Sequence, residues 1–248
     1  MTLRPSIPAT TPTPTSVPRL DLYAPIHKAL RAWMFDTLVC LGRVDGRDPA
    51  ALSAALRQVE ALMAVCEGHI LHEETFLHPV LEACRRDAAR EADQAHNGHQ
   101  RQVERMKAAI AGLRSTHGGP LLSGLTALYR ELALFVAENL EHMHWEETVH
   151  NEVLWARHSD AELERVHDAL VQSIPPQEMA EILRHMLPAL SPIERVGMLA
   201  DMRSKMPPQA FDGVLQLAHE VLGAHCWADL QRALGLKLTL PAARAMAC

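Results

Sequence analysis

The chain has 248 residues, 48% of them hydrophobic and 22% charged, a composition typical of a globular protein with one or two domains. The formal net charge of −6, without a lysine- or arginine-rich stripe, argues against a nucleic-acid partner. The five cysteines form no Cys-x-x-Cys pair. No stretch approaches the roughly 18 apolar residues of a membrane span, and no signal-like segment begins the chain. We therefore expect a cytoplasmic protein with reduced thiols and no membrane partner.

The first 19 residues are rich in proline and threonine and predict a loosely extended arm. Four long amphipathic stretches follow, separated by turns rich in glycine and proline, at about residues 23–41, 49–84, 88–113 and 121–155. Short connections between long helices favour antiparallel packing. The predicted fold is all-α, with an antiparallel up-down four-helix bundle over residues 20–158.

The sequence pattern changes after Ser159, because prolines divide the chain there into shorter amphipathic segments. The dividing residues are Pro175, Pro176, Pro188, Pro192, Pro207 and Pro208. They predict four short helices in a smaller all-α C-terminal unit over residues 159–237, followed by a tail at 238–248.

A sequence motif that occurs on both the second and the fourth predicted helix contains candidate metal ligands. Both copies read His-x-x-x-Glu-Glu-Thr, beginning at His69 and at His142. A His and a Glu four positions apart lie one turn apart on one helix face, so His69 with Glu73, and His142 with Glu146, form chelating pairs. Each pair continues the apolar stripe of its helix, and we expect both pairs to face the core.

Buried carboxylates are costly unless a cation or several donors offset their charge. The other two helices also direct imidazoles inward, because His27 shares a face with apolar residues and His96 and His99 interrupt an apolar stripe. At least six candidate ligands, including two carboxylates able to bridge, exceed the needs of a tetrahedral zinc site. The set fits two octahedral ions better, with iron the first choice and manganese the second.

These residues resemble the hemerythrin-like HHE cation-binding domain family over roughly residues 20 to 157. The resemblance rests on His27-Lys-Ala-Leu-Arg31, the two His-x-x-x-Glu-Glu elements and a third-helix histidine. It implies two iron ions joined by two carboxylates and by a small oxo or hydroxo group. The implied terminal ligands are His27, His69, His99 and His142, and the implied bridging carboxylates are Glu73 and Glu146.

The chain departs from the oxygen-carrying hemerythrins at two places. Those proteins have His-x-x-x-His on the third helix and His-x-x-x-x-Asp on the fourth, whereas this chain has His96-x-x-His99 and His142-x-x-x-Glu146. The second spacing is similar to a subgroup linked to nitric-oxide stress and the repair of iron-sulfur centres. Whether His96 is a further ligand, or only supports His99, decides how closely the site resembles an oxygen carrier.

The remaining polar residues near the repeat have less specific interpretations. Glu74 and Glu147 are expected to hydrogen-bond to the site or cap its rim. Four histidines are placed off the core face or at its edge, with contacts to ligands or solvent exposure as their expected roles: His72, His78, His144 and His150. Histidines of the C-terminal unit have no partner at ligand spacing.

The site and the resemblance together predict a protein that binds or senses O2, NO or peroxide, in oxygen binding or in the response to nitrosative or oxidative stress. Two alternatives stay open. One is a diiron oxidase or peroxidase-type enzyme, although no substrate-binding motif is visible. The other is a metal-responsive interaction module formed by the C-terminal helices. The expected partner is a small diatomic ligand or peroxide, and a homodimer is also open.

Overall fold

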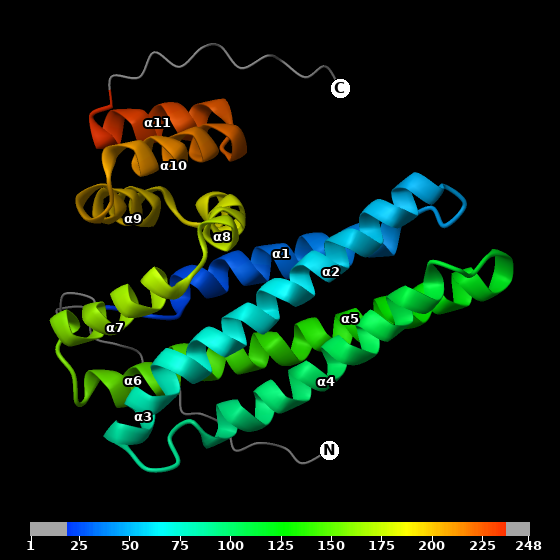
Figure 1. Cartoon of the computed structure of the whole chain (residues 1–248), viewed down its shortest axis with the longest axis horizontal. Coiled ribbons are helices and arrows are strands. Elements are labelled where there is room, and N and C mark those ends of the chain that lie inside the picture. Colours follow the sequence, from blue (N-terminus) through cyan, green and yellow to red (C-terminus); the bar gives the residue numbers. More distant parts are fainter. Residues whose placement is uncertain (1–18, 237–248) are drawn as a thin grey trace.

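A computed structural model describes residues 19–236, which form helices joined by short connections and contain no strand (Figure 1). The predicted all-helical class is therefore confirmed for this part of the chain. The predicted arm at residues 1–19, apart from Arg19, and the predicted tail at 238–248 lie outside the described residues.

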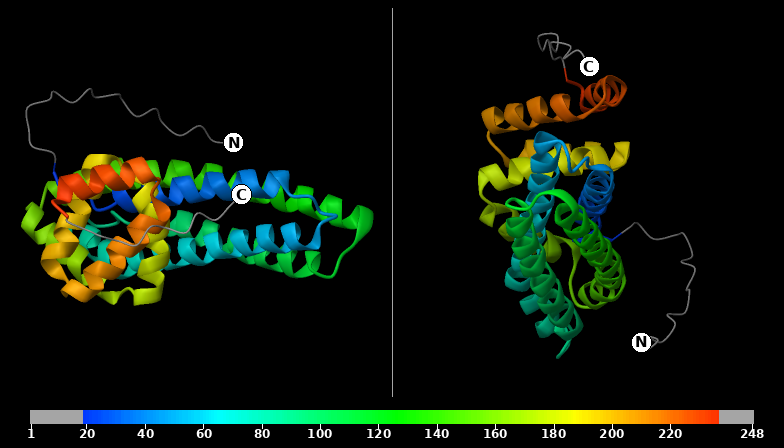
Figure 2. Two further views of the ribbon diagram at one scale, coloured as in Figure 1. Left: turned by 90° about the horizontal axis from the view of Figure 1, so that it is seen from above. Right: turned by 90° about the vertical axis from the view of Figure 1, so that its right-hand side faces the viewer.

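Four long helices form two hairpins that lie side by side: α1 (Ala24–Arg43) with α2 (Pro49–His72), and α4 (Arg90–Leu113) with α5 (Gly118–Trp145) (Figures 1 and 2). Contacts run between α1 and α2, between α4 and α5, and across the hairpins from α1 to α5 and from α2 to α4. Each long helix therefore has two neighbours around a shared interior. We call residues 24–155 the long-helix unit.

The sequence explains where these helices begin and which faces they bury. The Asp48 side chain accepts hydrogen bonds from the backbone N–H groups of Ala50 and Ala51, and Pro49 opens α2. Apolar residues three and four apart face the interior. The core of this unit includes Leu30, Met34, Leu56, Val59, Leu62, Met63, Met106, Ile110, Leu128 and Leu132.

Two of the predicted helices contain a π-helical turn. The stretch after α2 passes through η1 (Glu73–Leu77) into α3 (His78–Cys84), and the stretch after α5 passes through η2 (Glu146–His150) into α6 (Asn151–Trp155). A π turn accommodates an extra residue, which rotates every following side chain by about 100° around the helix axis. Both π turns begin at the first glutamate of the Glu-Glu-Thr repeat.

The C-terminal part has five helices up to residue 236, where the described chain ends, and not the four that were predicted. They are α7 (Asp160–Ser173), α8 (Pro176–Ala189), α9 (Pro192–Lys205), α10 (Pro208–Val221) and α11 (Ala224–Leu234), each beginning 16 residues after the one before. Pro188 does not break the chain into a further segment, since it lies within α8 one residue before that helix ends. A boundary without proline, at residues 222–223, separates α10 from α11.

The C-terminal helices lie over one end of the long-helix unit (Figures 1 and 2). They have an apolar core of their own, but α7 packs on η1 and α8 packs on α1. Leu163 of α7 joins a cluster with Leu77 and Leu81, and Met186 of α8 packs in a cluster with Ala29 of α1. Helix α1 is therefore covered on one side by the C-terminal helices.

The stretch Gly118–Trp155 is the part of the described chain that is long and apolar enough to cross a membrane, with a mean hydropathy of 1.2 in its most apolar window. This is a weak indication, because core helices of soluble proteins pass the same test. Leu128, Leu132 and Phe135 of this stretch are completely or almost completely buried in the core. The helix is consistent with a soluble protein.

Candidate metal centre

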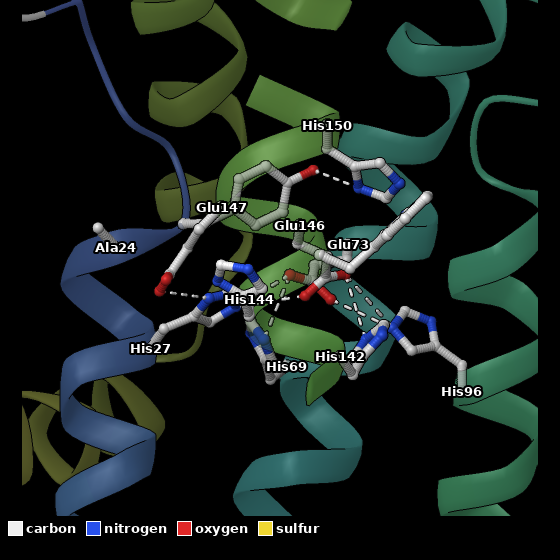
Figure 3. A network of polar contacts seen from close by, with 12 residues as sticks. Ala24, His27, His69, Glu73, His96, His142, His144, Glu146, Glu147 and His150 are labelled. Atoms are coloured by element: carbon white, nitrogen blue, oxygen red, sulfur yellow. Dashed lines mark hydrogen bonds and ion pairs between the residues drawn. The ribbon is translucent and has the colours of Figure 1, made fainter. Parts of the chain in front are cut away.

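Six side chains from four segments of the long-helix unit converge in its interior (Figure 3). Two are carboxylates from the π turns, Glu73 and Glu146. The other four are imidazoles: His27 of α1, His69 of α2, His96 of α4 and His142 of α5. The predicted inward orientation of both His-x-x-x-Glu pairs is therefore present in the structure.

The six side chains form two overlapping donor groups. His27 and His69 belong to one group and His96 and His142 to the other, while both glutamates belong to each. Within a group, one nitrogen or oxygen atom from each residue lies within 4.8 Å of all the others. This spacing is compact enough for each group to surround one metal ion.

Each carboxylate directs one oxygen towards each group. In Glu73, Oε1 lies 3.2 Å from His69 Nε2 and 3.7 Å from His27 Nε2, whereas Oε2 lies 3.3 Å from His96 Nε2. In Glu146, Oε2 lies 3.5 Å from His27 Nε2, and Oε1 lies 3.2 Å from His142 Nε2 and 3.8 Å from His96 Nε2. Two carboxylates oriented in this way are placed to bridge two ions.

The atoms that face one another in these groups have no hydrogen-bond partner among the described residues. They are the four imidazole Nε2 atoms and all four carboxylate oxygens of Glu73 and Glu146. A buried polar atom without a partner costs about 1 to 3 kcal/mol, and a buried charge costs more. Nitrogen and oxygen donors left open in this number fit coordinated metal ions.

Burial and mutual repulsion control the charge of the metal-free groups. Burial, together with the charge of Glu73, raises the pKa of the Glu146 carboxyl well above its ordinary value. Burial lowers the pKa of His69 and of His142 to about 3, which leaves both imidazoles neutral. Burial also lowers the pKa of His27, but the carboxylates of Glu147, Glu73 and Glu146 outweigh it and raise that pKa to about 9.

The second glutamate of each Glu-Glu pair holds a histidine of the other hairpin. Glu147 accepts a hydrogen bond from His27 Nδ1 at 3.1 Å and is held by Arg31 Nη1 and Nη2 at 2.6 and 3.0 Å. Glu74 accepts from His96 Nδ1 at 3.2 Å. In both residues Nδ1 is the nitrogen that bonds to the supporting carboxylate, so Nε2 is the nitrogen directed at Glu73 and Glu146. The hydrogen-bonding role predicted for Glu74 and Glu147 is confirmed.

The structure brings His96, and not His99, into the donor groups. The two residues are three positions apart on α4, so both face inward but at heights that differ by about 4.5 Å along the helix axis. Glu74 hydrogen-bonds to His96, whereas the His99 ring lies between Phe135 and His142, with ring centroids 5.7 and 5.2 Å away. His99 is buried, but it lies outside both groups.

The prediction that His78 and His150 lie off the core face or at its edge is wrong, because both are buried. His78 comes directly after η1, five residues after Glu73, and one π-helical turn puts it on the face of Glu73. His150 is the last residue of η2, four residues after Glu146, and shares that residue's face by ordinary helical spacing. His78 Nδ1 lies 2.7 Å from Asp93 Oδ1, and His150 Nδ1 lies 3.3 Å from the Tyr23 hydroxyl. Their Nε2 atoms have no hydrogen-bond partner in the described part of the chain. His144 is exposed, as predicted.

Comparison of the chain with family models, curated proteins and solved structures gives no match.

Proposed function

We propose that the long-helix unit is a hemerythrin-like, antiparallel up-down four-helix bundle that holds two iron ions and binds or senses O2, NO or peroxide. The observation that supports this proposal most strongly is the orientation of the two central carboxylates. Glu73 and Glu146 each present one oxygen to the His27–His69 group and the other to the His96–His142 group.

The donor set favours iron, with manganese as the second choice. His27 and His69 would hold one ion, His96 and His142 would hold the other, and both glutamates would bridge the two. Mixed imidazole and carboxylate donors suit these metals, and the interior of a helix bundle is where two-metal carboxylate proteins build such sites. Carboxylates shared between two positions favour a pair of ions over one tetrahedral zinc.

The chain's own residues would orient the ligands and shape the space beside them. Glu147 and Arg31 fix His27, and Glu74 fixes His96, so the ligand nitrogens are aligned before an ion arrives. His78, His150 and Tyr23 add buried polar atoms next to the donor groups, and His78 stacks on His96 at 5.2 Å. When bound, an iron pair supplies redox-active positions for a small ligand. The two central carboxylates are at most 2% exposed, which favours small ligands over large ones.

The proposal is tested by the reaction of the iron-loaded protein with small ligands. Optical spectra are recorded before and after O2, NO or hydrogen peroxide is added, for the native chain and for a Glu73→Gln/Glu146→Gln double variant. A spectral change in the native chain that is absent from the double variant supports the proposal. Spectra that none of the three ligands alters would contradict it.

A further inference from the structure

A surface pocket of about 350 Å³ opens between α4 and α5 and reaches the donor groups. Its lining includes Gly98 and His99 from α4, and His142 and Trp145 from α5. His142 belongs to the His96–His142 donor group, so the pocket joins the surface to a proposed ligand. The pocket therefore extends from the surface to the side of His142, whose Nε2 faces the buried centre.

The rim of this pocket is acidic. Glu91 of α4 and Glu138 and Glu141 of α5 line it, and all three residues are exposed. None of the described residues that line the pocket is a lysine or an arginine. Carboxylates around a concave opening raise the local concentration of cations and repel anions.

His99 gives this pocket a metal-binding group that the donor groups do not use. Its side chain lines the pocket, is only 3% exposed, and has an Nδ1 atom with no hydrogen-bond partner among the described residues. The His99 and His142 rings lie 5.2 Å apart. Because both rings line the pocket, a cation that left the acidic rim would find His99 beside His142.

We infer that the α4–α5 pocket is the port through which divalent metal cations load the centre. Glu91 and Glu138 concentrate the cation at the rim, and His99 holds it in transit before it passes to His142. The inference rests on the proposed metal centre and assigns a role to the one predicted ligand that lies outside both donor groups. Imidazole and carboxylate donors in sequence suit a divalent first-row metal ion.

The rate of metal loading tests the port, whereas the final metal content tests the centre. Metal-free full-length protein is mixed with excess Co2+, whose visible absorption reports uptake, and the final number of ions per chain is measured afterwards. A Glu91→Gln/Glu138→Gln variant is expected to load about tenfold more slowly at low ionic strength and to lose most of the salt dependence of the rate. The matched control is Glu104→Gln/Glu131→Gln, which removes two carboxylates from the same helices outside the pocket.

A steric variant tests the same route without changing charge. A Cβ atom added at Gly98 would meet only Arg101 Nη2, at 4.0 Å, so Gly98→Leu narrows the pocket without a backbone clash. Gly112→Leu on the same helix is the control, because its added Cβ meets nothing within 4 Å and it does not line the pocket. His99→Gln tests the transit position. Gly98→Leu and His99→Gln are expected to slow loading, whereas Gly112→Leu is not.

In all variants the final content is expected to stay at two ions per chain. If the Glu91→Gln/Glu138→Gln, Gly98→Leu and His99→Gln variants all load two ions per chain at the wild-type rate, the port is refuted. The proposed metal centre is then unaffected. Equal slowing in the control variants would also overturn the port, since the effect would then not belong to the pocket. A native chain that takes up no Co2+ would overturn both the port and the metal centre.

Discussion

The two parts of this protein differ in whether their buried charged side chains have hydrogen-bond partners. In the C-terminal helices, Arg195 is 5% exposed and donates from Nε to the Leu187 carbonyl at 2.7 Å and from Nη2 to the Leu190 carbonyl at 2.8 Å. In the long-helix unit, Glu73 and Glu146 are buried as deeply, yet none of their carboxylate oxygens has a hydrogen-bond partner within the described residues.

The presence of hydrogen-bond partners indicates a polar group with a structural role, and their absence indicates a group that binds a ligand. A buried group that serves only the fold is satisfied by the chain itself, and native structures leave few exceptions. Most exceptions among the described residues are imidazole nitrogens and carboxylate oxygens at the donor groups or beside them, the two chemical types that bind transition metals. The others are one atom each of Gln102, Trp145 and Asn151. The contrast, and not the number of histidines, identifies the centre.

The largest expected effect is that of metal removal on stability. Because ions bind the folded donor groups and not the unfolded chain, loaded protein gains about 4 kcal/mol in the free energy of unfolding at a metal concentration of about 1,000 times Kd. Denaturant unfolding with and without a chelator measures this gain. The Glu73→Gln/Glu146→Gln double variant is expected to show no such gain. A native chain that is equally stable with and without the chelator would contradict the proposed metal binding by these carboxylates.

Loss of the satisfied buried group should destabilise the C-terminal helices. Arg195→Met leaves two carbonyls without their charged donor and is expected to lower the free energy of unfolding by about 2 to 3 kcal/mol. Urea unfolding measures the change, with Arg184→Met as control, because Arg184 is largely exposed and its replacement is expected to cost below about 0.5 kcal/mol. Equal stability of the two variants would refute the structural role of Arg195.

The glutamates that hold His27 and His96 should affect metal affinity more than folding. Glu147→Gln removes the charge that orients His27, and a 10- to 100-fold loss of affinity is expected, which is about 1.4 to 2.7 kcal/mol. Competition with a metal chelator measures it. Glu152→Gln, an exposed change in α6, is the control. If both variants bind metal with the affinity of the native chain, the hydrogen bond from His27 to Glu147 does not contribute to metal affinity.

The smallest expected effect concerns pH and the contact between the two parts of the chain. The Lys28 ammonium, with Ser191, lowers the pKa of Glu194 from 4.5 to about 2. A lowered folded-state pKa means that the pair stabilises the protein above about pH 4.5 and loses this contribution as the pH falls towards 2. The side chains are partly exposed, so we expect less than about 1 kcal/mol.

Unfolding of the native chain and of Glu194→Gln, compared from about pH 6 towards pH 3, measures this contribution. The difference in stability between the two should shrink with acidity. A difference that stays constant over this range would show that the ion pair is not its source.

Much of this arrangement could be predicted from the sequence because it follows regular helical periodicity. Apolar spacing located the long helices, and the His-x-x-x-Glu spacing placed His69 with Glu73 and His142 with Glu146 on inward faces. The π turns could not be predicted from composition, since one extra residue changes only the phase of the pattern. That phase shift brings His78 to the face of Glu73, whereas His150, four residues after Glu146, already lies on that residue's face by ordinary helical spacing.

Two further features have signals in the sequence. The doubled glutamates indicate that one carboxylate faces the centre while its neighbour holds a histidine of the facing hairpin, which points to His96 as the partner of Glu74. In the C-terminal part, Pro-Pro-Gln occurs at residues 175–177 and again at 207–209, twice the 16-residue interval between helix starts. This repeat predicts evenly spaced helices, including the boundary that lacks proline.

The central claim is that Glu73 and Glu146 bridge two metal ions, and the metal content of aerobically purified protein tests it most directly. The account predicts close to two irons per chain in the native protein, with loss of both in Glu73→Ala and in Glu146→Ala, because each carboxylate serves both donor groups. A single zinc ion or no metal, unchanged by either substitution, would contradict it.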